Sequence, residues 1–231
     1  MIRDKQAAGK YGRAFILASV LLLILFLFSG VSSAVENKNS EIRKPVFDYF
    51  VMSFCPYSNQ VEPVISELYS EFKGKVEFKP HYVIYEDSGH PLFSCLYPQN
   101  KSYCAMHGLN ELYQDVREVC VKQEYGLGKY YKFITGVNEK CGQNVTCWKE
   151  IASDLRISIK KIERCAEENK FNILAKELSI TNNFSVYGSP TFFINGELYE
   201  GVRTEEALKQ EICNSFEKKP SICKLNLSGG K

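Results

Sequence analysis

Hydrophobic and polar positions predict a strand, a helix and a second strand over residues 45–86. The run 45–54 is rich in Val, Phe and Tyr and has few polar residues, which favours a strand buried on both faces. Apolar residues then recur at helical spacing up to Phe72, and Pro56 suits the first turn of that helix. The segment 75–86 again has the pattern of a strand.

The middle of the chain has a helical pattern, and the end returns to strands. Glycine, proline and polar residues predict a loop at 87–103. Between Cys104 and Asn183 the apolar spacing is helical, and the expected helices are 105–123, 128–139, 146–155, 158–169 and 170–182. Within 187–213, Asn195-Gly196 is a type I′ hairpin signal, and Thr204 suits the N-cap of a last helix. The pattern predicts an α/β chain but not its strand order.

The N-terminal segment differs in kind from the rest. Basic residues precede an apolar run at 15–28, and small residues follow it up to Ala34. This order is typical of a secretory signal peptide. Counted from residue 14 to 31, the run is also just long enough for an uncleaved membrane anchor. Residues 1–34 are therefore expected to be a signal peptide or an anchor, and both interpretations place the remaining chain in an extracytoplasmic or secretory compartment.

Composition sets the size of the folded part. Residues 35–44 have the composition of a polar linker and 217–231 that of a polar tail, so the expected domain is 45–216 with a helical insertion at about 104–183. A chain of 231 residues that is 45% hydrophobic can bury a sizeable core. The formal net charge of +2 gives no argument for nucleic-acid binding.

The cysteines point to one free thiol. There are nine, all after the N-terminal segment, and in an oxidising compartment most should pair. Four local pairs would use eight of them: Cys95–Cys104, Cys120–Cys165, Cys141–Cys147 and Cys213–Cys223. Because nine is odd, parity then leaves Cys55 free in a monomer. Connectivity stays open at this point, and the alternative is that Cys55 pairs with a neighbour while another cysteine is free.

Cys55 stands where the first strand ends and the helix begins. Unpaired N–H groups and the helix dipole favour a thiolate there, and the thiolate is the nucleophile of thiol–disulfide exchange. Redox proteins often place a second cysteine three residues later, but this position holds Ser58. A hydroxyl cannot release a mixed disulfide, although it can donate a hydrogen bond to the Cys55 thiolate. Release would then depend on an external thiol or redox protein.

The element order, the segment FCPYS at 54–58 and the segment GSPTFFING at 188–196 resemble the thioredoxin superfamily, specifically DsbA-type proteins with a helical insertion. The resemblance covers about residues 45–216. It implies a thioredoxin-like fold in which Cys55 is the reactive cysteine and Pro190 is a cis-proline opposite it. The residues implied to shape the site are Pro56, Tyr57, Ser58, Ser189 and Pro190.

The segment 104–120 shows a second, weaker resemblance, to gamma-interferon-inducible lysosomal thiol reductases. The matching positions are His107, Gly108, Glu111 and Cys120. Leu112 and Asp115 depart from that pattern, Cys104 is displaced by one residue, and the Cys-x-x-Cys of that family is missing. This resemblance supports an exported thiol protein with a disulfide-stapled insertion and does not transfer a substrate.

The sequence thus predicts an exported monothiol thiol–disulfide oxidoreductase or isomerase that acts on protein disulfides through a mixed disulfide on Cys55. It is expected to need no cofactor and no metal; Cys104 and His107 have ligand-like spacing, but export and pairable cysteines favour disulfides. The expected partners are protein thiols and disulfides, an external thiol or redox protein, the membrane if residues 1–34 remain, and no nucleic acid.

One alternative is a binding module that holds clients as mixed disulfides without turnover, and another is a fold remnant with a buried or paired Cys55. Glu62 is expected to be either a proton acceptor near Cys55 or, more simply, a solvated helix residue.

Overall fold

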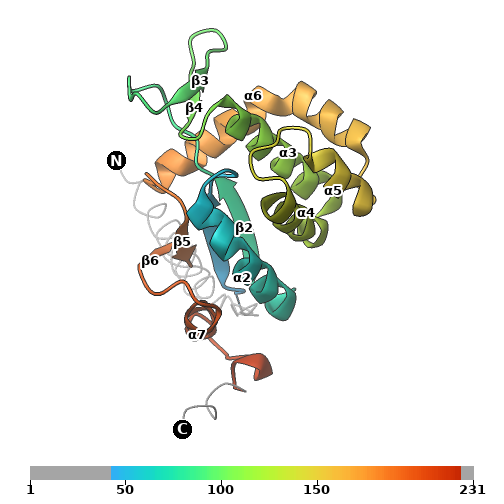
Figure 1. Ribbon diagram of the computed structural model, residues 1–231. Coiled ribbons are helices and arrows are strands. Elements are labelled where there is room, and N and C mark those ends of the chain that lie inside the picture. Colours follow the sequence, from blue (N-terminus) through green and yellow to red (C-terminus); the bar gives the residue numbers. More distant parts are fainter. Residues whose placement is uncertain (1–42, 225–231) are drawn as a thin grey trace, which may run out of the picture. The chain divides into compact units, whose positions relative to one another are not determined.

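The computed structural model of the protein describes residues 43–224 (Figure 1). The segment 1–34, most of the linker 35–44 and residues 225–231 of the tail lie outside the described residues, so the expectations for them stay predictions. Within 43–224, no helix combines the length and apolar character needed to cross a membrane.

The central sheet has four strands in the order β2-β1-β5-β6. They are β1 (Val46–Val51), β2 (Glu77–Tyr82), β5 (Thr191–Ile194) and β6 (Glu197–Tyr199). β1 runs parallel to β2, to which helix α2 (Pro56–Phe72) connects it, and antiparallel to β5. β5 and β6 form an antiparallel hairpin around Asn195-Gly196, where both residues have the positive φ of a type I′ turn.

A helical block is inserted between β2 and β5. Its helices are α3 (Leu109–Tyr125), α4 (Leu127–Lys140), α5 (Trp148–Asp154) and α6 (Ile159–Asn183). α3 packs against both α4 and α6, while α4 also contacts α2 (Figure 1). After β6, helix α7 (Glu205–Asn214) begins at Thr204, which accepts a hydrogen bond from the Ala207 N–H as an N-cap, and the short turn η1 (Ser221–Cys223) follows. The predicted α/β fold with a helical insertion is confirmed.

The long helix α6 corrects one expectation. The sequence predicts two helices, at 158–169 and 170–182, but the structure has one helix of 25 residues. No proline or glycine interrupts this segment. Asn169, at the end of the first expected helix, donates its side-chain N–H to the Cys165 carbonyl one turn earlier and stays inside the helix.

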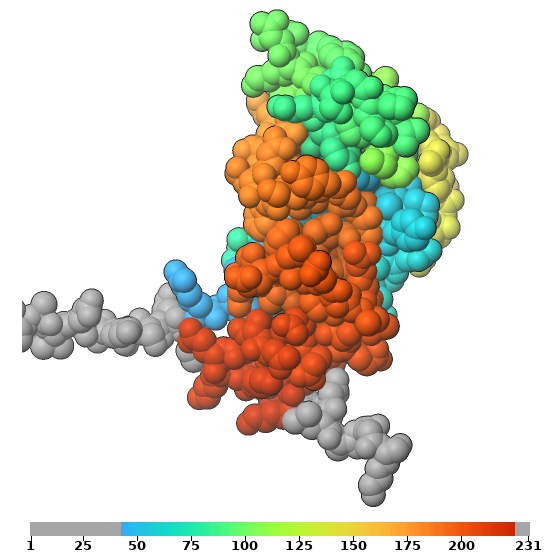
Figure 2. Space-filling model, turned by 90° about the vertical axis from the view of Figure 1, so that its left-hand side faces the viewer, coloured from blue at the N-terminus to red at the C-terminus, as the bar shows by residue number. Residues whose placement is uncertain are grey.

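The segment expected as a loop contains a small hairpin. Strands β3 (Ser94–Leu96) and β4 (Tyr103–Ala105) pair antiparallel, with Cys95 directly opposite Cys104. Cys104 therefore lies in a strand, and the helical block begins only at α3, after Gly108 with its positive φ of 95°. Strands of three residues are too short for an alternating pattern to reveal them. The hairpin and α7 lie at opposite ends of the described part in both views (Figures 1 and 2).

The side chains of β1 alternate between two cores. Phe47, Tyr49 and Val51 join the large cluster formed with α2 and the helical block. Phe50 of β1, and Met52 just after the strand, point to the opposite face, where they pack against β5 and the segment that follows α6. A strand covered on both faces explains why the run 45–54 is so apolar, although the strand itself ends at Val51.

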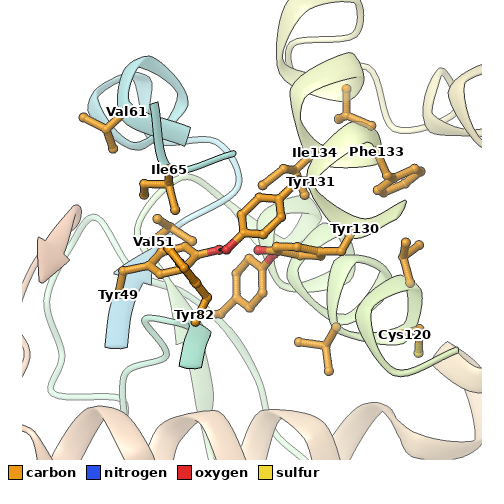
Figure 3. Close-up of a cluster of buried hydrophobic side chains, with 14 of the residues drawn as sticks. Tyr49, Val51, Val61, Ile65, Tyr82, Cys120, Tyr130, Tyr131, Phe133 and Ile134 are labelled. Carbon is orange, nitrogen blue, oxygen red and sulfur yellow. Dashed lines mark hydrogen bonds between the residues drawn. The ribbon is translucent and has the colours of Figure 1, made fainter. Parts of the chain in front are cut away.

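Tyrosine hydroxyls meet inside the larger core (Figure 3). Tyr49 donates to the hydroxyl of Tyr131 at 3.0 Å, and the hydroxyls of Tyr82 and Tyr130 lie 2.9 Å apart. Tyr82 also donates to Glu118 of α3 at 2.6 Å. Because buried hydroxyls need hydrogen-bond partners, these contacts fix α3 and α4 in register with the sheet.

Four disulfides connect the elements: Cys95–Cys104, Cys120–Cys165, Cys141–Cys147 and Cys213–Cys223. They are the same four pairs that local spacing suggests, and Cys55 is the free cysteine. Cys120–Cys165 links α3 to α6, and Cys141–Cys147 links the end of α4 to the start of α5. The insertion is therefore stapled by disulfides.

Replacing Cys120 and Cys165 together with alanine should lower the free energy of unfolding by roughly 4 kcal/mol, because that disulfide closes a 45-residue loop in the unfolded chain. The matched control replaces Cys213 and Cys223, which close a loop of only 10 residues and should cost roughly 1 kcal/mol less. Chemical denaturation of both variants measures the difference. An unchanged stability for the first variant would contradict a structural role for that disulfide.

Candidate active site

Cys55 occupies the N-cap position of α2. Its φ and ψ of −77° and 117° are extended, and Pro56 takes the first helical position, where a missing N–H costs no hydrogen bond. The thiol is unpaired, and the residue is 5% exposed. Cys55 thus stands at the start of the helix, although its side chain makes no capping hydrogen bond to the first turn.

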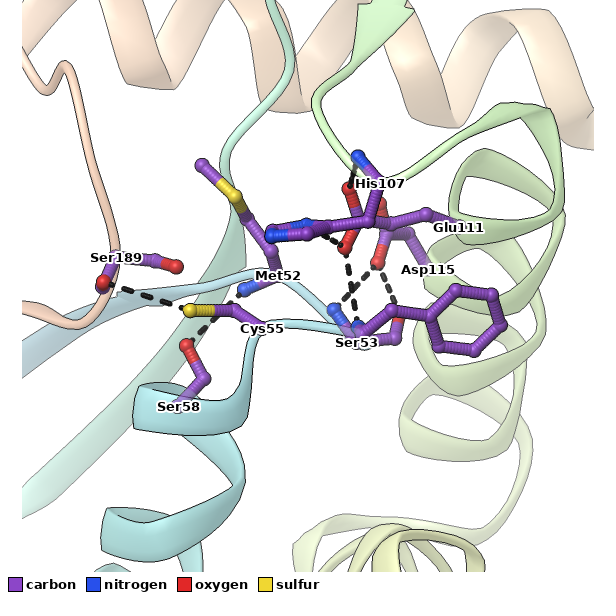
Figure 4. A network of polar contacts seen from close by, with 9 residues as sticks. Met52, Ser53, Cys55, Ser58, His107, Glu111, Asp115 and Ser189 are labelled. Carbon is purple, nitrogen blue, oxygen red and sulfur yellow. Dashed lines mark hydrogen bonds and ion pairs between the residues drawn. The ribbon is translucent and has the colours of Figure 1, made fainter. Parts of the chain in front are cut away.

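Every backbone N–H of the four-residue loop 52–55 has a hydrogen-bond acceptor (Figure 4). The Met52 N–H donates to Ser58 Oγ at 3.4 Å, and the Cys55 N–H donates to the Met52 carbonyl at 3.0 Å. The two N–H groups between them donate to side chains of α3. Their acceptors are Asp115 Oδ1, 3.2 Å from the Ser53 nitrogen, and Glu111 Oε1, 3.0 Å from the Phe54 nitrogen.

The loop before β5 faces the thiol. The Ser189–Pro190 peptide bond is cis, and the Cys55 Sγ lies 3.7 Å from the Ser189 carbonyl oxygen (Figure 4). Tyr85, just after β2, donates its hydroxyl to the Tyr187 carbonyl at 3.1 Å and so supports the same loop. The structure thus brings Cys55, Ser189 and Pro190 together, although 134 residues separate Cys55 from Ser189.

Ser58 lies on the first turn of α2 and is fully buried. The sequence predicts a hydrogen bond from its hydroxyl to the Cys55 sulfur, but no such bond joins these two described residues. Its oxygen instead accepts the Met52 N–H, because the loop turns back over the start of the helix. Ser58 therefore holds the loop that carries the thiol.

Apolar residues surround Cys55, while two aromatic residues close to the site in the sequence are exposed. The residue packs with Phe50, Met52 and residues of β5 in the smaller core, and Met106 covers this cluster in part. By contrast, the Tyr57 and Tyr187 side chains are 68% and 83% exposed. Tyr57 follows Cys55 by two residues and Tyr187 precedes Ser189 by two, so each side of the site has an exposed aromatic residue close by in the sequence.

Comparison with known proteins identifies the family to which the chain belongs. Residues 44–214 match the family model described as Thioredoxin. The chain belongs to the thioredoxin family. No curated protein matches the sequence significantly.

Solved structures share the fold of this thioredoxin-family chain at low sequence identity. DsbA from Mycobacterium tuberculosis is 17% identical with a TM-score of 0.55, covering 84% of this chain and 93% of that one. BdbD from Bacillus subtilis is 14% identical with a TM-score of 0.55, covering 74% and 86%. A disulfide bond oxidoreductase, DsbG from Mycobacterium tuberculosis, is 19% identical with a TM-score of 0.53, covering 78% and 82%. The thioredoxin-like fold of the DsbA type that the sequence predicts is confirmed.

The sequence did not predict that Glu111 and Asp115 accept hydrogen bonds from the loop that carries Cys55. Both are 1% exposed, and they lie one helical turn apart on α3 with their carboxyl groups toward the loop (Figure 4). Glu111 also bonds His107, with 2.7 Å between Oε1 and Nδ1. The resemblance over 104–120 includes His107 and Glu111 and so drew attention to these two residues, but it did not indicate what their side chains contact.

Glu62 is not a solvated helix residue. It is 1% exposed, and one carboxyl oxygen accepts a hydrogen bond from the Asn138 side chain while the other has no partner. Burial, together with the nearby Glu118, raises the pKa of Glu62 well above its usual range. The simple interpretation was wrong because position 62 faces the insertion rather than water.

Three buried carboxyls should make the stability depend on pH. Burial raises the pKa of Glu118 from 4.5 to about 7, and burial also raises the pKa values of Asp115 and Glu62. These groups keep protons in the folded state that the unfolded chain has already lost above pH 4.5 or so. The free energy of unfolding should therefore fall as pH rises from about 5 to 8, by on the order of 1–3 kcal/mol.

Thermal melts across this pH range measure the effect. Burial alone would raise the pKa of Glu177, but its contact with His81 holds that pKa below its usual range. Glu177 therefore makes the free energy of unfolding rise with pH, in the more acidic range where this carboxyl titrates. Glu118→Gln should flatten the slope between pH 5 and 8. A melting temperature that rises over this range in the unchanged protein would contradict the prediction.

Proposed function

We propose that the protein is an exported monothiol thiol–disulfide oxidoreductase or isomerase. The observation that carries this proposal is the free Cys55 at the start of α2, facing the cis-Pro190 loop, with a serine where a resolving cysteine would stand. Membership of the thioredoxin family supports the same conclusion, and one of its structural neighbours is named a disulfide bond oxidoreductase.

The first step is attack by the Cys55 thiolate on a disulfide of a client protein. The N–H groups of the first turn of α2 and the helix dipole stabilise the anion. A bond forms between Cys55 Sγ and one client sulfur, the client disulfide breaks, and the other client sulfur leaves as a thiolate that takes up a proton. The loop at Ser189 and Pro190 would hold the client segment beside the sulfur, and the exposed Tyr57 and Tyr187 rings offer it apolar contact.

The second step needs a thiol from outside the protein. Ser58 cannot attack the mixed disulfide, and the other eight cysteines are paired in disulfides. A client thiol, a small thiol or another redox protein must therefore release the client. No bound cofactor is required, because thiols carry the electrons in both steps.

Export fits both the sequence and the disulfides. The apolar segment at 15–28 has the features of a secretory signal or anchor, and structural disulfides are typical of proteins in oxidising compartments. A second function, that of a module which holds clients without turnover, is favoured by the 5% exposure of Cys55 and the missing resolving thiol. Persistence of client adducts in the presence of free thiol would identify this second function.

Replacing Ser58 with cysteine tests the proposal. Positions 55 and 58 are neighbours at the start of the helix, and cysteine is close in size to the buried serine. The new thiol should form a disulfide with Cys55 under oxidising conditions and should release a mixed-disulfide client at least roughly tenfold faster, because its attack is intramolecular. Mass spectrometry of trapped adducts measures the release.

Two variants serve as controls. Ser70→Cys places a thiol on the exposed surface of the same helix, far along from Cys55, and should not speed release. Cys55→Ala should form no adducts and show no exchange activity. If Ser58→Cys forms no internal disulfide, the placement of the two positions at one site is wrong.

A further inference from the structure

Glu111 connects the Cys55 loop to a histidine. One oxygen, Oε1, accepts the Phe54 N–H at 3.0 Å and lies 2.7 Å from His107 Nδ1, while Oε2 accepts the His107 backbone N–H at 3.2 Å. A carboxylate only accepts hydrogen bonds, so the tautomer that fits this contact is the one with the ring proton on Nδ1. In that tautomer the lone pair lies on Nε2, and 26% of the His107 side chain is exposed.

His107 lies on the side of the loop opposite the cis-proline. Figure 4 shows the Ser189 carbonyl on one side of Cys55, with His107, Glu111 and Asp115 on the other, and the imidazole points from the segment just before α3 toward the loop 52–55. A thiolate that attacks a disulfide approaches in line with the sulfur that leaves. If the client occupies the Ser189 side, the incoming thiol must arrive from the His107 side.

Resting on the proposed function, we propose that His107 is the proton acceptor for the external thiol that releases the client, and that Glu111 is its positioning residue. His107 Nε2 takes the proton of the incoming thiol, and the resulting thiolate forms a bond with Cys55 Sγ. The bond between Cys55 and the client breaks, and the client thiolate leaves with the proton from His107. A second molecule of the same thiol then loses its proton and attacks the sulfur of the first thiol rather than Cys55 Sγ. The bond between Cys55 and that sulfur breaks, Cys55 leaves as a thiolate that can take up the proton, and the two small thiols are joined in a disulfide.

Several other titratable groups surround His107 and Glu111. Asp115 and Glu118 interact with Glu111 from the same helix, and burial raises the pKa of both, so each is protonated more readily than an ordinary carboxyl. Tyr85 faces Glu111 and Cys55 from the end of β2, and burial raises the pKa of its hydroxyl to about 12, so it stays neutral. Cys55 and, beyond it, Glu62 of α2 are the other groups, and burial raises the pKa of Glu62 as well.

The structure offers a matched control. Glu177 of α6 is also buried, accepts the Tyr82 N–H at 3.0 Å and lies 3.6 Å from His81 Nδ1. It makes the same kinds of contact as Glu111, but with β2 rather than with the loop that carries Cys55. Glu177→Gln therefore reproduces the loss of a buried carboxylate, and His90→Ala reproduces the loss of a histidine on the surface.

The experiment measures attack and release separately in the full chain. Attack is followed as the rate at which Cys55 forms a mixed disulfide with a peptide that carries an activated disulfide, and release as the rate at which glutathione frees that peptide between pH 5.5 and 9. In His107→Ala and Glu111→Gln the ratio of release to attack should fall at least tenfold at pH 7, since general base catalysis typically contributes about 10²–10⁴. The deficit should narrow toward pH 9, where glutathione ionises without help, and added imidazole should restore release in His107→Ala.

Glu177→Gln and His90→Ala should keep the ratio of the unchanged protein. An unchanged ratio in His107→Ala, an equal fall in Glu177→Gln, or no recovery with imidazole would overturn the role of His107. Failure of the unchanged protein to form any mixed disulfide on Cys55 would instead overturn the proposed function, and this inference with it.

Discussion

The site depends on the hydrogen bonds from the loop 52–55 to two carboxyl groups of α3. Without Glu111 and Asp115, the Ser53 and Phe54 N–H groups would be buried without acceptors, at a cost of about 1–3 kcal/mol each. These contacts decide where the chain turns from β1 into α2, and that turn sets the position of Cys55. The helical insertion is therefore part of the site, because it supplies the acceptors that the short loop cannot supply itself.

Pairing of the other cysteines concentrates the thiol chemistry at one position. Eight cysteines hold the hairpin, the helical block and the C-terminal segment, which leaves Cys55 as the one thiol able to exchange. Its burial beside the Ser189 carbonyl restricts access to partners that fit between the two loops. Ser58 contributes to this geometry through the Met52 N–H and leaves the release of a client to a thiol from solution.

Local patterns predicted the parts of the fold that short-range forces determine. The strand, cysteine and helix around position 55, the Asn195-Gly196 turn and the N-cap at Thr204 all follow from neighbouring residues. The β3–β4 hairpin was missed because its short strands depend on the disulfide and on pairing between Tyr85 and Cys104. The contacts of α3 with the site join residues 57 and 62 positions apart, so no local pattern could reveal them.

Alkylation of the native, unreduced protein tests the central claim most directly. The protein is treated with iodoacetamide at near-neutral pH, and the labelled cysteines are mapped by peptide mass spectrometry; the same protein, unfolded but not reduced, serves as the control. The account predicts that Cys55 alone is labelled in both samples, more slowly in the folded one if its 5% exposure limits access. Dominant labelling of another cysteine, or no label on Cys55, would contradict it.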